Sequence, residues 1–335
     1  MQYEYTEPQK IFEENGEVKC AGWAKKPCFI FNKEQSRQTR QIKESVSYFF
    51  SNNKISLYVA MENIGIDFYI KIAVADLKSG KVISDYIYKK QLIGKAELPE
   101  SNENGQFTCS DRRIEFALVK VKNERTIKCN FYDFGDITNL SFEINIDSKK
   151  GDILEQLAPF ERDRKYFYFK QFMPVFYGKG TIKVGLTQYT LSENDTSVYI
   201  DRTNYSKPRL HSYQRLSADY MKGDNRFSLC LASRVGDNRN GSENSFFLNG
   251  NLNKLYKIEV KNNDGRIDRP WYFKGGIEAV DITFKPTKIN DKAMIAQMDN
   301  TAVTFGVLFG KIKRYDFDTP LILDNIPAHM VFSEF

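Results

Sequence analysis

Apolar and polar residues alternate at every second position through much of this chain. The pattern is clearest in residues 66–74, 140–146 and 280–284, where Ile, Val, Leu or Phe recurs with a period of two. Successive side chains of a β-strand point to opposite faces, so this period gives each strand one apolar face for a core and one polar face for solvent. The sequence therefore predicts an all-β protein of antiparallel strands.

Turn-forming residues divide these runs into a series of hairpins. Asn249-Gly250 is the strongest hairpin signal, because both residues tolerate the positive φ of a type I′ turn. Convincing helices are scarce. Only residues 33–46 and 151–157 are expected to form short helices, and neither carries a long apolar stripe.

The pattern changes near the middle of the chain. Residues 147–164 are rich in charged side chains and include Pro159, which is typical of a linker between two packed units. A chain of 335 residues is also long for a single hydrophobic core. We therefore predict two β-domains, residues 1–150 and residues 151–335.

Composition excludes several classes of protein. The 49 basic and 43 acidic residues leave a net charge of +6 that is scattered, with no basic run longer than a doublet, so we expect no nucleic-acid partner. No apolar run approaches the roughly 18 residues that a membrane span needs, and the acidic N-terminus lacks the apolar centre of a signal peptide. The five cysteines are odd in number and lack paired spacing, which indicates free thiols and a cytoplasmic location.

The sequence contains no catalytic motif. Its two histidines, His211 and His329, have no second histidine or cysteine at metal-ligand spacing. There is no glycine-rich phosphate loop after a strand and no nucleophile elbow. We therefore expect no metal and no cofactor, while the oligomeric state and the question of whether the protein is an enzyme stay open.

Three polar clusters stand at the ends of apolar strands: Asp201-Arg202, Glu243-Asn244 and Lys170. Ionisable groups at a barrel mouth can act as acid, base or electrostatic stabiliser, since burial shifts their pKa values. Alternatively, Asp201, Arg202 and Glu243 meet there as a structural network in which the charges satisfy one another. The candidate ligand-binding residues are Lys170, Asp201, Arg202, His211, Tyr213, Glu243, Asn244 and Trp271.

Short motifs over nearly the whole chain follow the order seen in one family. They are Glu7-Pro8, Asn15-Gly16, Ala21-Gly22-Trp23, Tyr168 with Lys170, Asp201, Glu243-Asn244, Trp271, Phe284-Lys285-Pro286 and residues 305–310. With these motifs the chain resembles an uncharacterised microbial family known only as a domain of unknown function. That family is similar to the calycin group, whose two-domain members include carotenoid hydratases, tocopherol cyclase and some fungal cyclases. The resemblance implies two lipocalin-like barrels, or strongly curved sheets, packed together with an apolar cavity.

Three functions stay open, and we rank ligand binding first. In that hypothesis a small, largely apolar molecule is bound, or hydrated, isomerised or cyclised, in a barrel cavity, and a barrel filled by its own side chains would count against it. The second is a carbohydrate-binding or carbohydrate-active protein, with Trp23 and Trp271 exposed and with Asp201 and Glu243 facing one open groove. The third is a structural or interaction module without a ligand.

Overall fold

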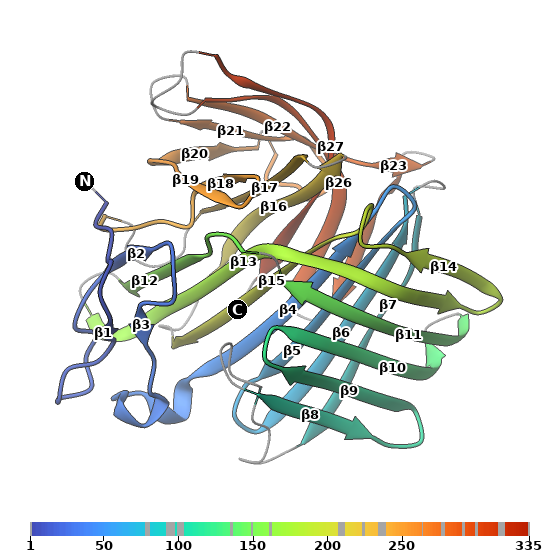
Figure 1. Ribbon diagram of the computed structural model, residues 1–335, viewed down its shortest axis with the longest axis horizontal. Coiled ribbons are helices and arrows are strands. Elements are labelled where there is room, and N and C mark those ends of the chain that lie inside the picture. Colours follow the sequence, from blue (N-terminus) through green and yellow to red (C-terminus); the bar gives the residue numbers. More distant parts are fainter. Residues whose placement is uncertain are drawn as a thin grey trace.

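Strands, almost all of them antiparallel, make up most of the described chain (Figure 1). The computed structural model describes residues 2–77, 81–91, 98, 104–134, 137–148, 150–160, 163–206, 212–222, 225–233, 239–262, 264–275, 279–289, 292–298, 301–313 and 319–333. The helical elements in these residues are two 3-10 turns, η1 (Lys33–Gln35) and η2 (Thr39–Gln41). No helix in this part of the chain is long and apolar enough to cross a membrane. The all-β prediction is confirmed.

A 13-stranded sheet forms the first half of the fold. Its main path runs β7-β6-β5-β4-β15-β13-β11-β10-β9-β8, with β12 and β14 paired to β13 and with β2 paired to β12. The strands are β2 (Gly22–Ala24), β4 (Lys43–Ser51), β5 (Ile55–Asn63), β6 (Asp67–Asp76), β7 (Lys81–Gln91), β8 (Gly105–Ser110), β9 (Ile114–Val121), β10 (Glu124–Phe134), β11 (Ile137–Ser148), β12 (Leu154–Phe160), β13 (Asp163–Val184), β14 (Thr187–Leu191) and β15 (Ser197–Ser206).

A 10-stranded sheet forms the second half, in the order β19-β18-β17-β16-β27-β26-β22-β21-β20, with β25 paired to β26. Its strands are β16 (Tyr213–Lys222), β17 (Asn225–Ser233), β18 (Ser245–Leu248), β19 (Asn251–Lys254), β20 (Ile258–Lys261), β21 (Trp271–Gly275), β22 (Val280–Pro286), β25 (Ile295–Met298), β26 (Thr301–Ile312) and β27 (Leu321–Ser333). Two short pairs complete the fold: β1 (Gln9–Lys10) with β3 (Phe29–Ile30), and β23 (Lys288–Ile289) with β24 (Lys292–Ala293).

Sheet membership changes between Ser206 and Tyr213 rather than at residue 150. The region predicted to be a linker contains β12, whose Pro159 lies opposite Phe167 of β13. The short helix predicted at residues 151–157 is therefore wrong, and the helix predicted at 33–46 is limited to the two 3-10 turns. The division into domains 1–150 and 151–335 stays a prediction. The first sheet contains hydrogen-bonded strands from both sides of residue 150.

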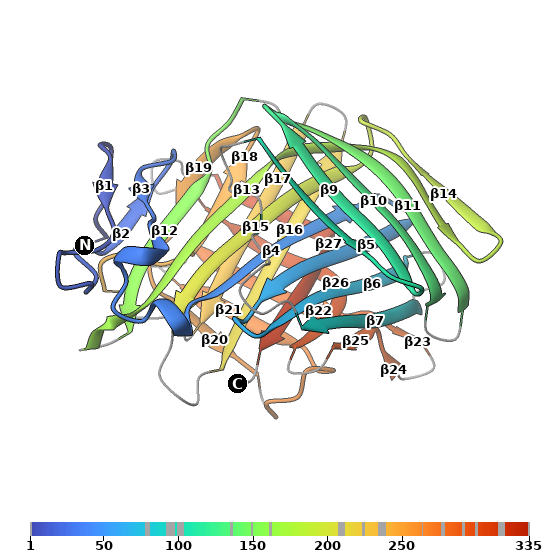
Figure 2. The same ribbon diagram turned by 90° about the horizontal axis from the view of Figure 1, so that it is seen from below.

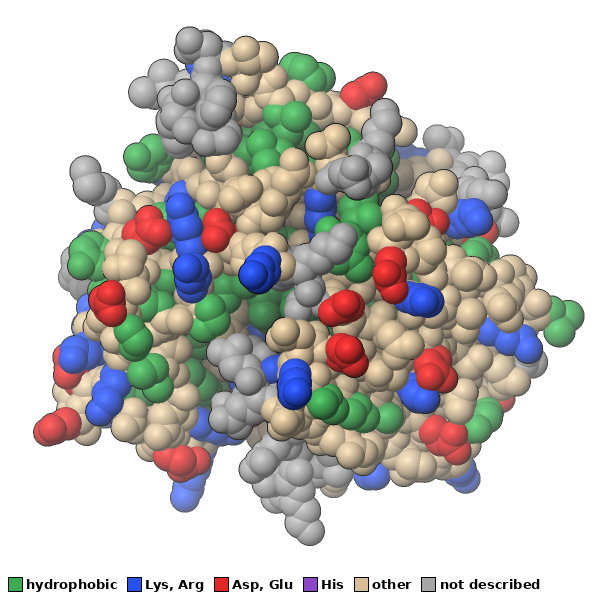
Figure 3. All heavy atoms as spheres, viewed as in Figure 1, with side chains coloured by type: hydrophobic (Ala, Val, Ile, Leu, Met, Phe, Trp, Pro, Cys, Tyr) green, Lys and Arg blue, Asp and Glu red, His purple; other side chains and the backbone are tan. Residues whose placement is uncertain are grey.

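Each sheet curls around an apolar core of its own (Figure 2). The first core contains Phe68, Phe131 and Phe142, and the second contains Phe246 and Phe273, all at most 3% exposed. Along each strand every second side chain points inward, and these large side chains occupy such positions. The two interiors are therefore filled by the protein itself. Basic and acidic side chains are interspersed over the side of the molecule seen in Figure 3.

The outer faces of the two sheets pack against each other. Phe49 of the first sheet stacks on Phe305 of the second at a ring-centroid distance of 6.5 Å, and Phe172 packs at a tilt against Phe247 at 5.9 Å. This interface also contains buried polar contacts, because Arg226 of β17 donates to the backbone oxygens of residues 176 and 198 at 2.7 Å and 2.8 Å. The candidate site lies in the same interface.

Candidate functional site

Four charged side chains meet between the two sheets. Lys170 of β13 and Asp201 of β15 belong to the first sheet, and Arg215 of β16 and Glu243, two residues before β18, belong to the second. Lys170 Nζ lies 3.0 Å from Asp201 Oδ2 and 2.5 Å from Glu243 Oε2. Arg215 Nη1 lies 3.0 Å from Asp201 Oδ2, and its Nε lies 2.9 Å from Glu243 Oε2. Each carboxylate therefore contacts both cations.

This four-residue charge cluster is almost fully buried, with exposed fractions of 0% for Lys170, 5% for Asp201, 6% for Arg215 and 2% for Glu243. Burial alone would raise the pKa of Glu243, but the charges of Arg215 and Lys170 have the larger effect and lower this pKa to about 2. Burial lowers the pKa values of Lys170 and Arg215, and the two carboxylates outweigh this and raise both. These three groups are therefore charged at neutral pH. The hydroxyl of Tyr168 accepts a further hydrogen bond from Arg215.

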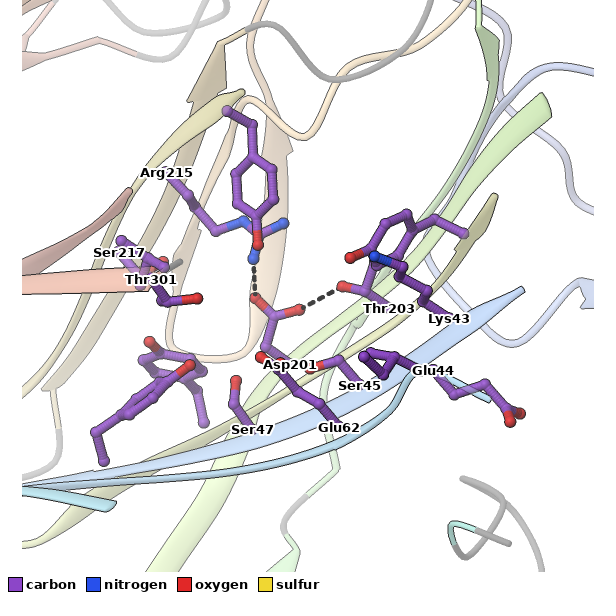
Figure 4. Close-up of a pocket in the computed structure, with 16 residues that line it drawn as sticks. Lys43, Glu44, Ser45, Ser47, Glu62, Asp201, Thr203, Arg215, Ser217 and Thr301 are labelled. Atoms are coloured by element: carbon purple, nitrogen blue, oxygen red, sulfur yellow. Dashed lines mark hydrogen bonds and ion pairs between the residues drawn. The ribbon is translucent and has the colours of Figure 1, made fainter. Parts of the chain in front are cut away.

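A small cavity lies beside the cluster (Figure 4). Its volume is about 30 Å³, which is room for about one or two water molecules. Buried side chains from both sheets form its floor, including Ser47, Tyr58, Tyr199, Asp201 and Arg215. Lys170 and Glu243 lie behind this floor and hold Asp201 and Arg215 in place.

Half-buried side chains form the mouth of the cavity, among them Ile64, Tyr205 and Tyr213. Charged groups at the mouth are compensated, since Glu62 pairs with Lys71 at 2.8 Å. The mouth therefore combines aromatic and aliphatic surface with paired charges.

Among the buried side chains of the lining, three hydroxyl groups have no hydrogen-bond partner in the described part of the chain. They are Tyr58 Oη and Ser47 Oγ, on the neighbouring strands β5 and β4, and Ser217 Oγ of β16. Burial raises the pKa of Tyr58, so its phenol stays protonated and can donate. The site thus offers unused donors beside the carboxylate of Asp201.

A histidine-tyrosine pair closes one side of the floor. Tyr199 Oη lies 2.5 Å from Nε2 of His329, which stacks on Phe49 with ring centroids 4.0 Å apart. Burial, together with the nearby charge of Arg215, lowers the pKa of His329 to about 3. His329 is therefore a neutral hydrogen-bonding partner of Tyr199.

The structure brings three of the eight predicted residues into the cluster: Lys170, Asp201 and Glu243. Tyr213 lines the mouth. Arg202 does not join them, because adjacent residues of a strand face opposite ways, and its charge instead acts on the pKa values of Glu155 and Tyr48. Arg215 is the arginine that meets the two carboxylates.

The other three predicted residues do not line the cavity or lie beyond the described structure. Asn244 accepts a hydrogen bond from the backbone N–H of Ala232 at 3.0 Å, so it orders a loop. Trp271 is 5% exposed and packs on Phe332 in the second core. His211 lies outside the described residues.

The prediction missed Arg215, Tyr58, Tyr199 and His329 as residues of the site. A signal for Arg215 was present, since Tyr213, Arg215, Ser217 and Asp219 put polar side chains at alternate positions of one strand. Within the described residues no group of three His, Cys, Asp or Glu side chains could hold a metal ion.

The family described as "Domain of unknown function (DUF2804)" matches residues 2–329. The chain belongs to this family. A comparison with curated proteins finds no significant match.

Solved structures share the fold at low sequence identity. Kievitone hydratase from Nectria haematococca is 11% identical, with a TM-score of 0.57 over 98% of both chains. CghA with Sch210972 is 8% identical, with a TM-score of 0.50 over 88% of this chain and 89% of that one. The fold is thus that of the calycin-like double-barrel proteins.

Proposed function

We propose that the protein binds a small, largely apolar molecule with one oxygen-bearing end in the cavity between the two sheets. The observation that carries this proposal is the floor, where Asp201, Arg215 and the hydroxyl of Tyr58 face a water-sized space. The oxygen-bearing end occupies this floor, and the apolar body lies in the mouth against Ile64 and the tyrosine rings. The ligand thus spans an interface that neither sheet forms alone.

The charge cluster supports this placement of the ligand. Buried ion pairs contribute little to stability once desolvation is counted, and breaking one by removing a partner is costly. A buried set of four charges is therefore better explained as a device that fixes Asp201 and Arg215 beside the cavity than as a source of stability. Lys170 and Glu243 act as positioning residues, because Lys170 contacts Asp201, Glu243 contacts Arg215, and the two contact each other.

The proposed site differs from the barrel interior expected from the sequence. Both interiors are filled by large apolar side chains, whereas the cavity beside Asp201 lies between the sheets. The fold shared with a protein named kievitone hydratase and with CghA, solved with Sch210972, supports a small-molecule function.

The carbohydrate alternative finds less support. Glycoside hydrolysis needs two carboxyl groups facing the substrate from an open cleft. Here Asp201 and Glu243 are buried and share the same two cations. Trp23 and Trp271 are 6% and 5% exposed, too little to serve as stacking platforms.

We also infer that the protein works in a reducing compartment, the cytoplasm. All five cysteines are free in the structure, and four of them are buried. Free buried thiols are typical of proteins kept under reducing conditions.

Binding can be tested through the imidazole resonances of the protein, because the sequence has only His211 and His329. The variant His211→Gln assigns the His329 signal, and phenol serves as the probe. We expect a saturable shift of the His329 signal, since its Nε2 bonds to Tyr199 of the cavity wall. Ser47→Val should abolish this shift by filling the floor, and Ser141→Val on the outer face of β11 should not. A wild-type protein without a saturable shift, or equal shifts in both variants, would refute the proposal.

A further inference from the structure

We infer that the oxygen bound in the floor is a neutral hydroxyl group, so the ligand is an alcohol or a phenol. In this arrangement the hydroxyl donates a hydrogen bond to Asp201 and accepts one from Tyr58. The inference rests on the proposed function and goes further by naming the chemical class of the ligand. Its evidence lies in the size, the hydrogen-bonding groups and the charge of the floor.

The size of the floor matches one hydroxyl group. A cavity of about 30 Å³ has space for about one or two waters, and too little for a carboxylate or a ring. A hydroxyl has nearly the volume of a water molecule and can reproduce its hydrogen bonds, so it can replace a water there without loss. The rest of the ligand then extends into the mouth.

Asp201 has the acceptor that a hydroxyl needs. Its Oδ2 accepts from both Lys170 and Arg215 at 3.0 Å. Its Oδ1 has one long contact in the described structure, 3.4 Å from the hydroxyl of Thr203 (Figure 4). A carboxylate oxygen can accept two hydrogen bonds, so Oδ1 has capacity for a ligand donor.

Tyr58 and Ser47 supply the matching donors. Neither hydroxyl has a hydrogen-bond partner among the described residues, and both line the floor. An oxygen in the floor can accept a hydrogen bond from either hydroxyl. Tyr199 is already bonded to His329, so the available donors among the buried side chains of the lining are Tyr58, Ser47 and Ser217.

The charge of the floor favours a neutral group. The two cations and two carboxylates of the cluster already pair with one another, so a ligand carboxylate or ammonium would add a buried charge without a counter-charge of its own. An ether or a carbonyl oxygen is neutral but has no proton to donate to Asp201. Only a hydroxyl both donates and accepts without adding charge.

Three probes with the same ring separate these cases: phenol, anisole and benzoate. Their dissociation constants are measured from the shift of the His329 resonance in the wild type, in Tyr58→Phe and in the control Tyr132→Phe, whose ring is 40% exposed on β10. We expect phenol to bind at least about tenfold more tightly than the other two. Tyr58→Phe should weaken phenol binding by about three- to tenfold, while Tyr132→Phe should leave it unchanged.

The outcomes distinguish the inference from the proposed function. Equal affinities for phenol and anisole, or tightest binding of benzoate, would overturn the neutral hydroxyl and leave the cavity as a ligand site. An unchanged phenol affinity in Tyr58→Phe would overturn the role of Tyr58 as donor. If no probe shifts the His329 resonance saturably, the proposed function itself fails. Thermal melts check that Tyr58→Phe is folded, which we expect because its hydroxyl has no partner in the described residues.

Discussion

Replacing Glu243 by Gln removes one charge from the buried cluster and keeps its shape. Glu243 contacts Lys170 at 2.5 Å and Arg215 at 2.9 Å, so the change leaves two cations against the single carboxylate of Asp201. A site role for Glu243, one of the two alternatives that the sequence leaves open, predicts that this variant keeps or gains stability and loses ligand retention. The structure places Glu243 behind the floor and not in its lining, so we now expect a loss of stability.

The loss can be estimated from the contacts. Breaking a buried ion pair from one side costs about 3–5 kcal/mol, and the lower end applies because the Gln oxygen still accepts one hydrogen bond. With a melting temperature that falls about 2 °C per kcal/mol in a large domain, the variant should melt about 6 °C lower. The pKa of Glu243 is depressed from 4.5 to about 2, so the stabilisation is complete above pH 4.5 and disappears as the pH falls towards 2.

Denaturant unfolding of the wild type, Glu243→Gln, Lys170→Met and the double variant measures this coupling. The double variant restores equal numbers of buried charges, so it should be less destabilised than the sum of the single variants by at least about 1 kcal/mol. Unchanged stability in Glu243→Gln, or additive effects in the double variant, would refute the view that the cluster is one coupled unit.

Three further predictions concern other parts of the molecule. Gly250→Val should lower the free energy of unfolding by more than about 1 kcal/mol, because Gly250 has a φ of +81°; a change within about 0.5 kcal/mol in denaturant unfolding would contradict this. The imidazole of His329 should stay neutral in NMR titrations as the pH falls from 6.5 towards 3, because its pKa is lowered to about 3. The unfolded chain takes up that proton first, so stability should decrease over this range, and His329→Gln should reduce the decrease; a His329 signal that titrates near pH 6.5 would contradict the burial. Arg226→Met should destabilise the protein by about 3–5 kcal/mol, because it leaves Asp219 buried without its cation and removes the hydrogen bonds to the backbone oxygens of residues 176 and 198 in the first sheet; an unchanged melting temperature would contradict this.

Local patterns in the sequence predict the strands and the sharpest turn well. The period of two appears as strands with one buried face, as in β22, where Val280, Ile282 and Phe284 are buried. Asn249 and Gly250 both have positive φ, at 50° and 81°, between the paired strands β18 and β19. These features depend on a few adjacent residues, which is why the sequence reveals them.

The site depends on contacts between distant segments, which local patterns do not specify. Asp201 and Glu243 were predicted to share an arginine, and they do, but it is Arg215 of another strand instead of the adjacent Arg202. Which strand of the second sheet faces β15 is decided by how the two outer faces pack. The same packing brings His329 to Tyr199, a pair separated by 130 residues.

A crystal structure with 4-bromophenol would show where the ligand binds, because the anomalous signal of bromine locates the ring. We predict one site between the two sheets, with the phenol oxygen in hydrogen-bond contact with Asp201 and Tyr58 and with the bromine directed towards Ile64 and Tyr213. Binding inside either barrel core, on the outer face of the first sheet, or between the sheets with the oxygen turned away from Asp201 would contradict the account.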